Sequence, residues 1–160
     1  MEIIVTAGAG EGKTYVSAFD AALMKAGTAN YNLIYLSSVI PKESVIQERQ
    51  CEAPEKDYGN KLYVVMSRCD QYVFGKEAWA GLGWVQDKEG RGLFVEHKAE
   101  SRDELSRLIE HSLNDMSRSR PYEYGEIHAA TCGIECKNQP ACAVIMAVYR
   151  SEPFSQIGKK

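Results

Sequence analysis

The apolar positions in the first sixty residues predict a strand, a helix and a second strand. A short apolar run predicts a buried strand over residues 3–7, and residues 14–26 place apolar side chains at helical spacing. The apolar face of that helix is expected to carry Val16, Phe19 and Leu23. Residues 32–37 alternate as in a strand. Residues 42–60 are charged and lack a period, so we expect them to form an irregular cover.

The rest of the chain predicts a hairpin, a helix and two final strands. Strands are expected over residues 61–69, 78–86, 92–98, 124–134 and 141–150. The polar stretch 87–91 would turn the chain between the second and third of these. Ser101 and Glu104 form a capping box, because each side chain can satisfy the other residue's free backbone donor. The helix that follows is expected to place on one face Leu105, Leu108, Ile109, Ser112 and Met116.

Two amphipathic helices and about six strands, some paired in hairpins, predict an α/β (α+β) layered sandwich. We expect mixed β-sheets covered by helices. The length of 160 residues fits one domain, so residues 1–160 are assigned to a single domain. The tail after Pro153 is expected to be mobile.

Composition and charge narrow the class of protein. The chain is 44% hydrophobic and 26% charged, as in soluble globular proteins. A formal net charge of −3 argues against nucleic acid as the main partner, because phosphate binding needs a basic face. No apolar run approaches the roughly 20 residues of a membrane span. Five cysteines and no signal stretch argue against a secreted, disulfide-linked domain, so we expect a cytoplasmic protein.

The glycine-rich stretch from Gly8 to Thr14 invites a phosphate-binding interpretation. Its Lys13-Thr14 end resembles the end of a Walker A motif. That motif requires a glycine five residues before Gly12, however, and the position holds Ala7. We therefore favour a tight strand-to-helix turn. A small nucleotide-binding protein that uses the Gly8–Thr14 stretch stays open as an alternative.

A second stretch ends a predicted strand in two serines and a proline, and reads Leu36-Ser37-Ser38-Val39-Ile40-Pro41. By itself this pattern is typical of a strand end followed by a turn. Together with other segments it closely resembles the pyruvoyl-dependent arginine decarboxylase family. Those segments are Ala7-Gly8, Glu11-Gly12, Ala18-Phe19-Asp20-Ala21-Ala22-Leu23, Ala26-Gly27, Asn30-Tyr31-Asn32-Leu33-Ile34, Gly92-Leu93-Phe94-Val95-Glu96 and Ala141-Cys142-Ala143. The resemblance is strong over residues 3–42 and continues in order to about residue 150; residues 42–76 and His97-Lys98 depart from it.

The resemblance implies a proenzyme that cleaves itself between Ser37 and Ser38. The products would be a β chain of residues 1–37 and an α chain of residues 38–160. In the implied chemistry the Ser38 hydroxyl attacks the Ser37 carbonyl to form an ester. Elimination and hydrolysis then convert residue 38 to a covalent pyruvoyl group. Amino-acid decarboxylation needs such a group, because no ordinary side chain can accept the electrons left at Cα.

Three further residues acquire roles by the same resemblance. Glu96 would return a proton to the substrate, and Asn32 would help to position the cleavage site. Asp20 would accept a bidentate pair of hydrogen bonds from a guanidinium. With Glu96 assigned to turnover alone, Glu96→Gln is expected to cleave normally and to decarboxylate about 10²–10⁴-fold more slowly.

No metal site is predicted. Cys132, Cys136, Cys142 and His128 could be imagined as zinc ligands, but they lack a CxxC pair, and Cys142 falls in an apolar strand. His97 adjoins Glu96 and could tune it, although a solvent-facing histidine is the favoured interpretation.

The implied reaction converts L-arginine to agmatine and carbon dioxide, in polyamine biosynthesis or in acid consumption. The implied assembly is a homo-trimer or a pair of trimers, with active sites between subunits. Two further alternatives stay open. One is a pyruvoyl enzyme for another amino acid such as histidine, and the other is a relative that folds without cleaving.

Overall fold

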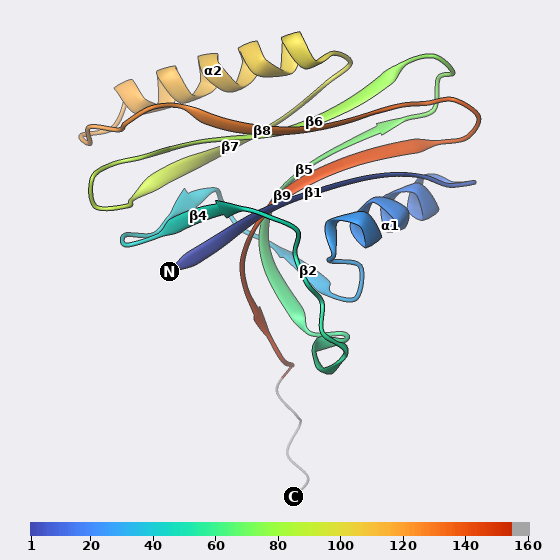
Figure 1. The fold of residues 1–160 in the computed structure, drawn as a ribbon. Helices are drawn as coiled ribbons and strands as arrows, with labels where there is room; N and C mark the ends of the chain where they lie inside the picture. Colours follow the sequence, from blue (N-terminus) through green and yellow to red (C-terminus); the bar gives the residue numbers. More distant parts are fainter. Residues whose placement is uncertain (155–160) are drawn as a thin grey trace, which may run out of the picture.

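The computed structural model describes residues 1–154, in which two β-sheets pack face to face and a helix covers the outer face of each sheet (Figure 1). The predicted α/β (α+β) layered sandwich of mixed sheets covered by helices is therefore confirmed. The described residues contain nine strands. The two that no expected range covered are the short edge strands Val39–Ile40 and Val45–Glu48, which have no clear apolar period.

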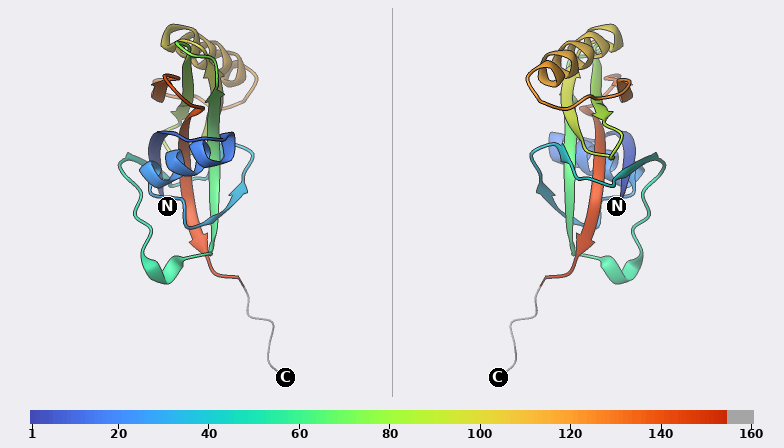
Figure 2. Two further views of the ribbon diagram at one scale, coloured as in Figure 1. Left: turned by 90° about the vertical axis from the view of Figure 1, so that its right-hand side faces the viewer. Right: turned by 90° about the vertical axis from the view of Figure 1, so that its left-hand side faces the viewer.

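The first sheet has five strands in the order β2-β5-β9-β1-β4. These are β1 (Glu2–Glu11), β2 (Asn32–Tyr35), β4 (Val45–Glu48), β5 (Lys61–Gln71) and β9 (Ala141–Glu152). β9 pairs antiparallel with β1 and β5, whereas β4 and β2 join the edges in parallel. The long strands β5 and β9 run side by side in both views of Figure 2. Residues 141–148 of β9 are all buried, because the strand lies between α1 and the second sheet.

The second sheet is antiparallel and has the order β3-β7-β6-β8. Its strands are β3 (Val39–Ile40), β6 (Glu77–Gln86), β7 (Gly92–Ala99) and β8 (His128–Glu135). The predicted hairpin is β6 and β7. Its turn is closed by the Asp87 carboxylate, which accepts hydrogen bonds from the backbone N–H groups of Glu89 and Arg91 at 2.9 and 3.0 Å. The strand expected from residue 124 begins only at His128.

The glycine-rich stretch is not the predicted turn. β1 continues through it, pairing with β9 as far as Glu11 opposite Ala141. A Cβ on Gly8 would overlap the carbonyl oxygen of Ala22 in α1 (Tyr15–Ala26), and one on Gly10 would lie 2.6 Å from the Cβ of Ala21. The glycines thus let the helix lie directly against the strand, a contact that local periodicity cannot reveal.

The buried face of α1 consists of small side chains for the same reason. Ala18, Ala22 and Ala26 are fully buried and Leu23 is nearly so. Val16, which was expected on this face, is 76% exposed, so that prediction is wrong. The ends of the helix are capped by Thr14 at the N-terminus and, at the C-terminus, by Gly27 with φ 76°.

α2 (Arg102–Arg118) begins at the predicted Ser101, whose side chain accepts a hydrogen bond from the N–H of Glu104 at 3.3 Å. This is one half of the expected capping box, because the Glu104 side chain does not bind the Ser101 N–H in return. Its buried residues are Leu105, Ile109 and Leu113, which pack on β6 and β7. Leu108 was expected on this face but is 36% exposed, so that prediction is wrong, and the third buried residue is Leu113.

The region 42–60, expected to be irregular, contains β4 and a short 3₁₀ helix, η1 (Glu55–Asp57). The expected mobile tail falls largely on residues 155–160, outside the described residues. In the part of the chain that the structure describes, no helix is both long and apolar enough to cross a membrane.

Candidate active site

The Ser37-Ser38 step lies where the chain crosses from one sheet to the other. The backbone N–H of Leu36, just after β2, still donates to Val64 of the first sheet at 2.9 Å. Three residues later, Val39 already pairs with Leu93 of the second sheet. Ser37 is exposed and Ser38 is half-buried. The step is therefore anchored on both sides yet lies outside both sheets.

Ser38 adopts an unfavourable backbone conformation, with φ 58°. In the described residues only one other non-glycine residue, Glu43, has a positive φ. This left-handed region costs an L-residue roughly 1–2 kcal/mol. The surrounding contacts maintain it, including a 2.8 Å hydrogen bond from the backbone N–H of Phe94 to the Ser38 carbonyl. Strain of this kind is typical of functional positions.

The hydroxyl of Ser38 donates to the carboxylate of Glu96, with an Oγ–Oε1 distance of 2.6 Å. The two residues are 58 positions apart. Glu96 follows the buried run Leu93 to Val95 on β7 and is itself half-buried. The distance is that of a charge-assisted hydrogen bond, typically about 2.5–2.7 Å. The carboxylate is thus placed to accept the hydroxyl proton.

Tyr149 on β9 completes this cluster. Its hydroxyl donates to the carbonyl of Val39 at 2.9 Å, and its ring lies edge-on to Phe94 with centroids 6.3 Å apart. Burial raises the pKa of the Tyr149 phenol, and the negative charge of Glu96 raises it further. No sequence signal pointed to Tyr149, because it lies 110 residues from its partner in the chain.

Asn32 and Asp20 do not join Ser38 and Glu96 within one chain. Asn32 begins β2, and its side-chain amide donates to the carbonyl of Gly59 at 2.7 Å. Asp20 is exposed on α1, which packs on β1 and β9 at the outer face of the first sheet. Glu96 lies on β7 of the second sheet. The structure therefore brings Glu96 to the Ser37-Ser38 step and leaves Asn32 and Asp20 outside that contact.

A phosphate-binding loop is contradicted by the strand pairing of the glycine-rich stretch. From Gly8 to Glu11 the backbone pairs with β9, and the N–H of Gly12 donates to the Pro140 carbonyl at 3.0 Å. A phosphate loop needs free N–H groups that point at the anion. The nucleotide-binding alternative therefore loses its binding site.

His97 does not tune Glu96. Its Nε2 atom lies 2.7 Å from the hydroxyl of Ser112 on α2. Successive side chains of a strand point to opposite faces, so His97 and Glu96 are directed apart. His128 stacks on Trp84, and Cys142 is buried in β9. Among the described residues no group of histidine, cysteine and carboxylate side chains is arranged to hold a metal ion.

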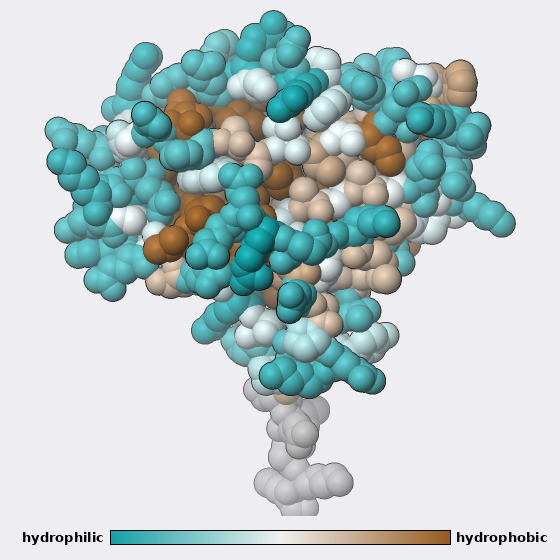
Figure 3. Space-filling view, viewed as in Figure 1, coloured by the Kyte–Doolittle hydropathy of each residue, from teal (hydrophilic) through white to brown (hydrophobic). Residues whose placement is uncertain are grey.

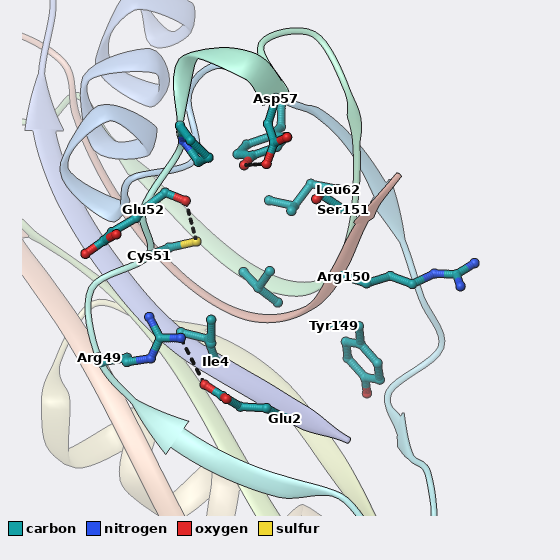
Figure 4. A pocket seen from close by; sticks show the side chains of 13 residues that line it. Glu2, Ile4, Arg49, Cys51, Glu52, Asp57, Leu62, Tyr149, Arg150 and Ser151 are labelled. Carbon is teal, nitrogen blue, oxygen red and sulfur yellow. Dashed lines mark hydrogen bonds and ion pairs between the residues drawn. The ribbon is translucent and has the colours of Figure 1, made fainter. Parts of the chain in front are cut away.

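Figure 4 shows a surface hollow that Tyr149 helps to line. The volume of this hollow is about 450 Å³. The hollow lies between the end of β9 and the loop that carries Arg49, Cys51 and Asp57. Ser38 and Glu96 do not line it. Cys51 and Asp57 lie across the hollow from Tyr149. The Tyr149 hydroxyl points away from them, toward the chain that joins β2 to β3 (Figure 4).

Comparison with known proteins shows the family of this chain. A family model described as pyruvoyl-dependent arginine decarboxylase matches residues 2–153. The chain belongs to the pyruvoyl-dependent arginine decarboxylase family. As the family's name says, its members depend on a pyruvoyl group.

Curated members of the pyruvoyl-dependent arginine decarboxylase family match over nearly their whole length. A relative from Thermococcus kodakarensis is 32% identical over 147 residues, which cover 90% of this chain and 91% of the relative. One from Pyrococcus furiosus is 33% identical over 149 residues, covering 91% and 92%. One from Halobacterium salinarum is 31% identical with the same coverage. All three carry the name pyruvoyl-dependent arginine decarboxylase.

Proposed function

We propose that this chain is the proenzyme of a lyase that cleaves itself between Ser37 and Ser38 and then decarboxylates L-arginine to agmatine and carbon dioxide. The observation that carries the proposal is the 2.6 Å contact between the Ser38 hydroxyl and the Glu96 carboxylate, at a residue with φ 58°. Family membership and the names of the relatives support the reaction and the substrate.

Maturation uses groups that this chain supplies. Glu96 takes the hydroxyl proton as Ser38 Oγ bonds to the carbonyl carbon of Ser37. The bond from that carbon to the Ser38 nitrogen breaks, the nitrogen gains the proton, and an ester remains. Loss of the Cα proton and of the Ser37 carboxylate leaves dehydroalanine at position 38. Water then converts it to a ketone and releases ammonia.

The surroundings of Ser38 fit a residue that becomes the pyruvoyl group. Its carbonyl is held by the N–H of Phe94, and its side chain contacts Glu96. Both partners belong to the proposed 38–160 chain, so cleavage does not remove them. The pyruvoyl group supplies an electron sink for the carbanion that decarboxylation leaves. We assign Glu96 to carry the proton that the substrate carbon requires.

Asp20 is proposed to bind the guanidinium of arginine in the site of a neighbouring chain. A carboxylate can accept two parallel hydrogen bonds from a guanidinium, and Asp20 is exposed on α1. Within one chain α1 covers the outer face of the first sheet, away from Glu96. A homo-trimer or a pair of trimers with sites between subunits would unite the two carboxylates.

Exposed apolar side chains at the two edges of the first sheet and just after the cleavage step are consistent with such an assembly. Tyr35, Val39 and Val45 are 61%, 57% and 59% exposed. Figure 3 shows apolar side chains gathered around β4, the strand that contains Val45. Covering them with a second copy would remove apolar surface from water.

Asn32 is retained as a residue that positions the cleavage site indirectly. Two hydrogen bonds fix the start of β2. The side-chain amide of Asn32 donates to the Gly59 carbonyl, and its backbone N–H donates to the Asn60 carbonyl at 2.8 Å. β2 leads directly into the Ser37-Ser38 step. The direction of the chain as it enters that step therefore depends on where β2 begins.

Denaturing mass spectrometry combined with carbon dioxide release tests the proposal. We expect a 1–37 chain, and a 38–160 chain that begins with a ketone and releases carbon dioxide from arginine. A preparation that stays one intact chain after prolonged incubation would refute the proposed enzymatic activity. It would favour the alternative of a relative that folds without cleaving. Cleavage with a preference for histidine would refute the substrate alone.

Mixed assemblies test whether the site lies between subunits. Asp20→Asn and Glu96→Gln chains are produced together. An assembly that contains both then has sites with an intact Glu96 from one chain and an intact Asp20 from its neighbour. Arginine turnover per cleaved chain should rise above that of Asp20→Asn alone. If turnover does not rise in assemblies shown by mass to contain both chains, a site that combines Glu96 of one chain with Asp20 of its neighbour is contradicted.

A further inference from the structure

The short strand β3, which begins directly after the cleavage step, has few backbone partners. β3 comprises only Val39 and Ile40 and forms the edge of its sheet, so β7 is its single neighbour. The Ser38 carbonyl accepts from Phe94 on β7. Successive backbone groups of a strand point in opposite directions, so the Val39 carbonyl points away from β7. The Tyr149 hydroxyl binds that carbonyl at 2.9 Å.

We propose that Tyr149 is a positioning residue for self-cleavage and for the cleaved enzyme, an inference that rests on the function proposed above. By holding the Val39 carbonyl from the side opposite β7, Tyr149 fixes the residue next to Ser38. The segment is then held by Phe94 at Ser38 and by Tyr149 at Val39. Those two bonds come from different strands of different sheets.

The hydrogen bond from Tyr149 to Val39 matters because the backbone of Ser38 is strained. A residue at φ 58° relaxes toward the favoured regions unless its neighbours prevent the rotation. Attack on the Ser37 carbonyl requires the hydroxyl to stay in one orientation, and small misplacements slow such reactions strongly. A bond to the adjacent carbonyl restricts the rotation that would move Ser38 Oγ away from Glu96.

The hydrogen bond between Tyr149 and the Val39 carbonyl also holds the chain after cleavage. Cutting the chain after Ser37 removes the covalent link to β2, so residue 38 becomes a chain end. Tyr149, Phe94 and Glu96 all lie in the 38–160 chain and stay with it. Residue 38 is then held by its own bond to Phe94 and, along the chain, only through Val39 and Ile40. Tyr149 supplies one of the few bonds that still hold the new chain end.

The chemistry of Tyr149 favours positioning over proton transfer. Burial and the charge of Glu96 both raise the pKa of its phenol, which keeps the hydroxyl protonated near neutral pH. A protonated hydroxyl is the form that can donate to the Val39 carbonyl. The pH profile of cleavage should therefore keep its shape when the hydroxyl is removed.

Tyr149→Phe tests the proposal, because it removes the hydroxyl and keeps the ring on Phe94. We expect a folded protein whose cleavage is slowed about 5- to 100-fold, with an unchanged pH profile. In the cleaved fraction kcat should fall by a similar factor while KM for arginine changes little, because Tyr149 holds residues 38–40 and not the substrate. A residue that merely packs would leave all three quantities unchanged.

Tyr63→Phe is the matched control. Tyr63 lies on β5, beside β9, and its hydroxyl donates to Glu152 at 3.3 Å. The variant therefore also loses a hydrogen bond from a phenol, but not one to residues 38–40. We expect it to cleave and turn over as the wild type does. Equal rates for Tyr149→Phe, Tyr63→Phe and the wild type would overturn the proposal while leaving the proposed function intact.

Amide hydrogen exchange gives a second measurement that needs no chemistry. In a Ser38→Ala background the chain stays whole, and adding Tyr149→Phe should speed exchange at residues 38–40 and 42. Unchanged exchange there would overturn the proposal even if the single variant folded poorly. A wild type that never cleaves would defeat the proposed function, whereas the exchange result would still decide the role of Tyr149.

Discussion

Replacing Glu96 by glutamine changes the atom that contacts the Ser38 hydroxyl at 2.6 Å and little else. The amide keeps the shape of the carboxyl and can still accept a hydrogen bond. It lacks the charge and cannot take the proton. From the sequence alone we expected this variant to cleave normally and to fail only in turnover. The contact with Ser38 before cleavage changes that expectation, and we now expect both reactions to slow.

The magnitude follows from the loss of a positioned base. General acid–base catalysis is worth about 10²–10⁴-fold, which corresponds to about 3–5 kcal/mol of activation free energy. The charge-assisted bond is also about twice as strong as the neutral bond that replaces it. Cleavage of Glu96→Gln should therefore slow by about 10²–10⁴-fold relative to the wild type.

The assay begins with uncleaved chain. Protein from a brief cell-free synthesis is incubated, and samples are analysed by denaturing mass spectrometry for intact chain and for fragments 1–37 and 38–160. Ser38→Ala fixes the zero rate. Glu135→Gln, an exposed carboxylate at the end of β8, should cleave at the wild-type rate. A Glu96→Gln half-time close to that of the wild type would show that Glu96 is not the base for cleavage.

Three other variants test separate parts of the account. Ser38→Ala should leave one intact chain at all times, because alanine has no nucleophile; any 38–160 fragment would mean another route of cleavage. Asp20→Asn should weaken arginine use by about 10- to 150-fold, the value of a charge-assisted bidentate pair, while citrulline use changes much less. Equal losses for the two substrates, at equal pyruvoyl content, would make Asp20 a structural residue. Gly8→Ala should destabilise the fold by about 1–3 kcal/mol, because its Cβ meets the Ala22 carbonyl oxygen in α1. The melting temperature should fall by about 2–12 °C. Gly125→Ala, whose Cβ would meet its nearest neighbour at 3.4 Å, should melt as the wild type does, and an equal Tm for both variants would contradict the close packing of α1.

Local pattern was sufficient where the chain alternates regularly or carries its own turn. The hairpin β6–β7 could be predicted because two apolar runs flank a polar stretch. The start of α2 could be predicted because the Ser101 cap lies in the sequence beside the helix that it begins. In both cases the interactions that define the element join residues close together in the chain.

Local pattern failed where a distant element decided the outcome. The glycine-rich stretch precedes a helix and was interpreted as a turn, yet Gly8 and Gly10 lie within β1 because α1 folds back onto them. Val16 was assigned to the buried face by its spacing, but the small side chains of Ala18 and Ala22 face the strand. Periodicity reports that a helix has an apolar face and does not show how closely the helix will approach a sheet.

The sequence by itself determined the family, the fold class and the position of the Ser37-Ser38 step. Each can be inferred from short contiguous segments and from their order along the chain. Only the tertiary structure decided which groups meet at that step. Glu96 reaches Ser38 because β7 is the neighbour of β3, and Tyr149 reaches Val39 because the last strand of the other sheet passes close to that carbonyl. Asp20 and Asn32 were given roles by resemblance, but the fold of one chain directs them elsewhere. Reactivity depends on distances of a few ångströms, and these are fixed by the packing of the two sheets.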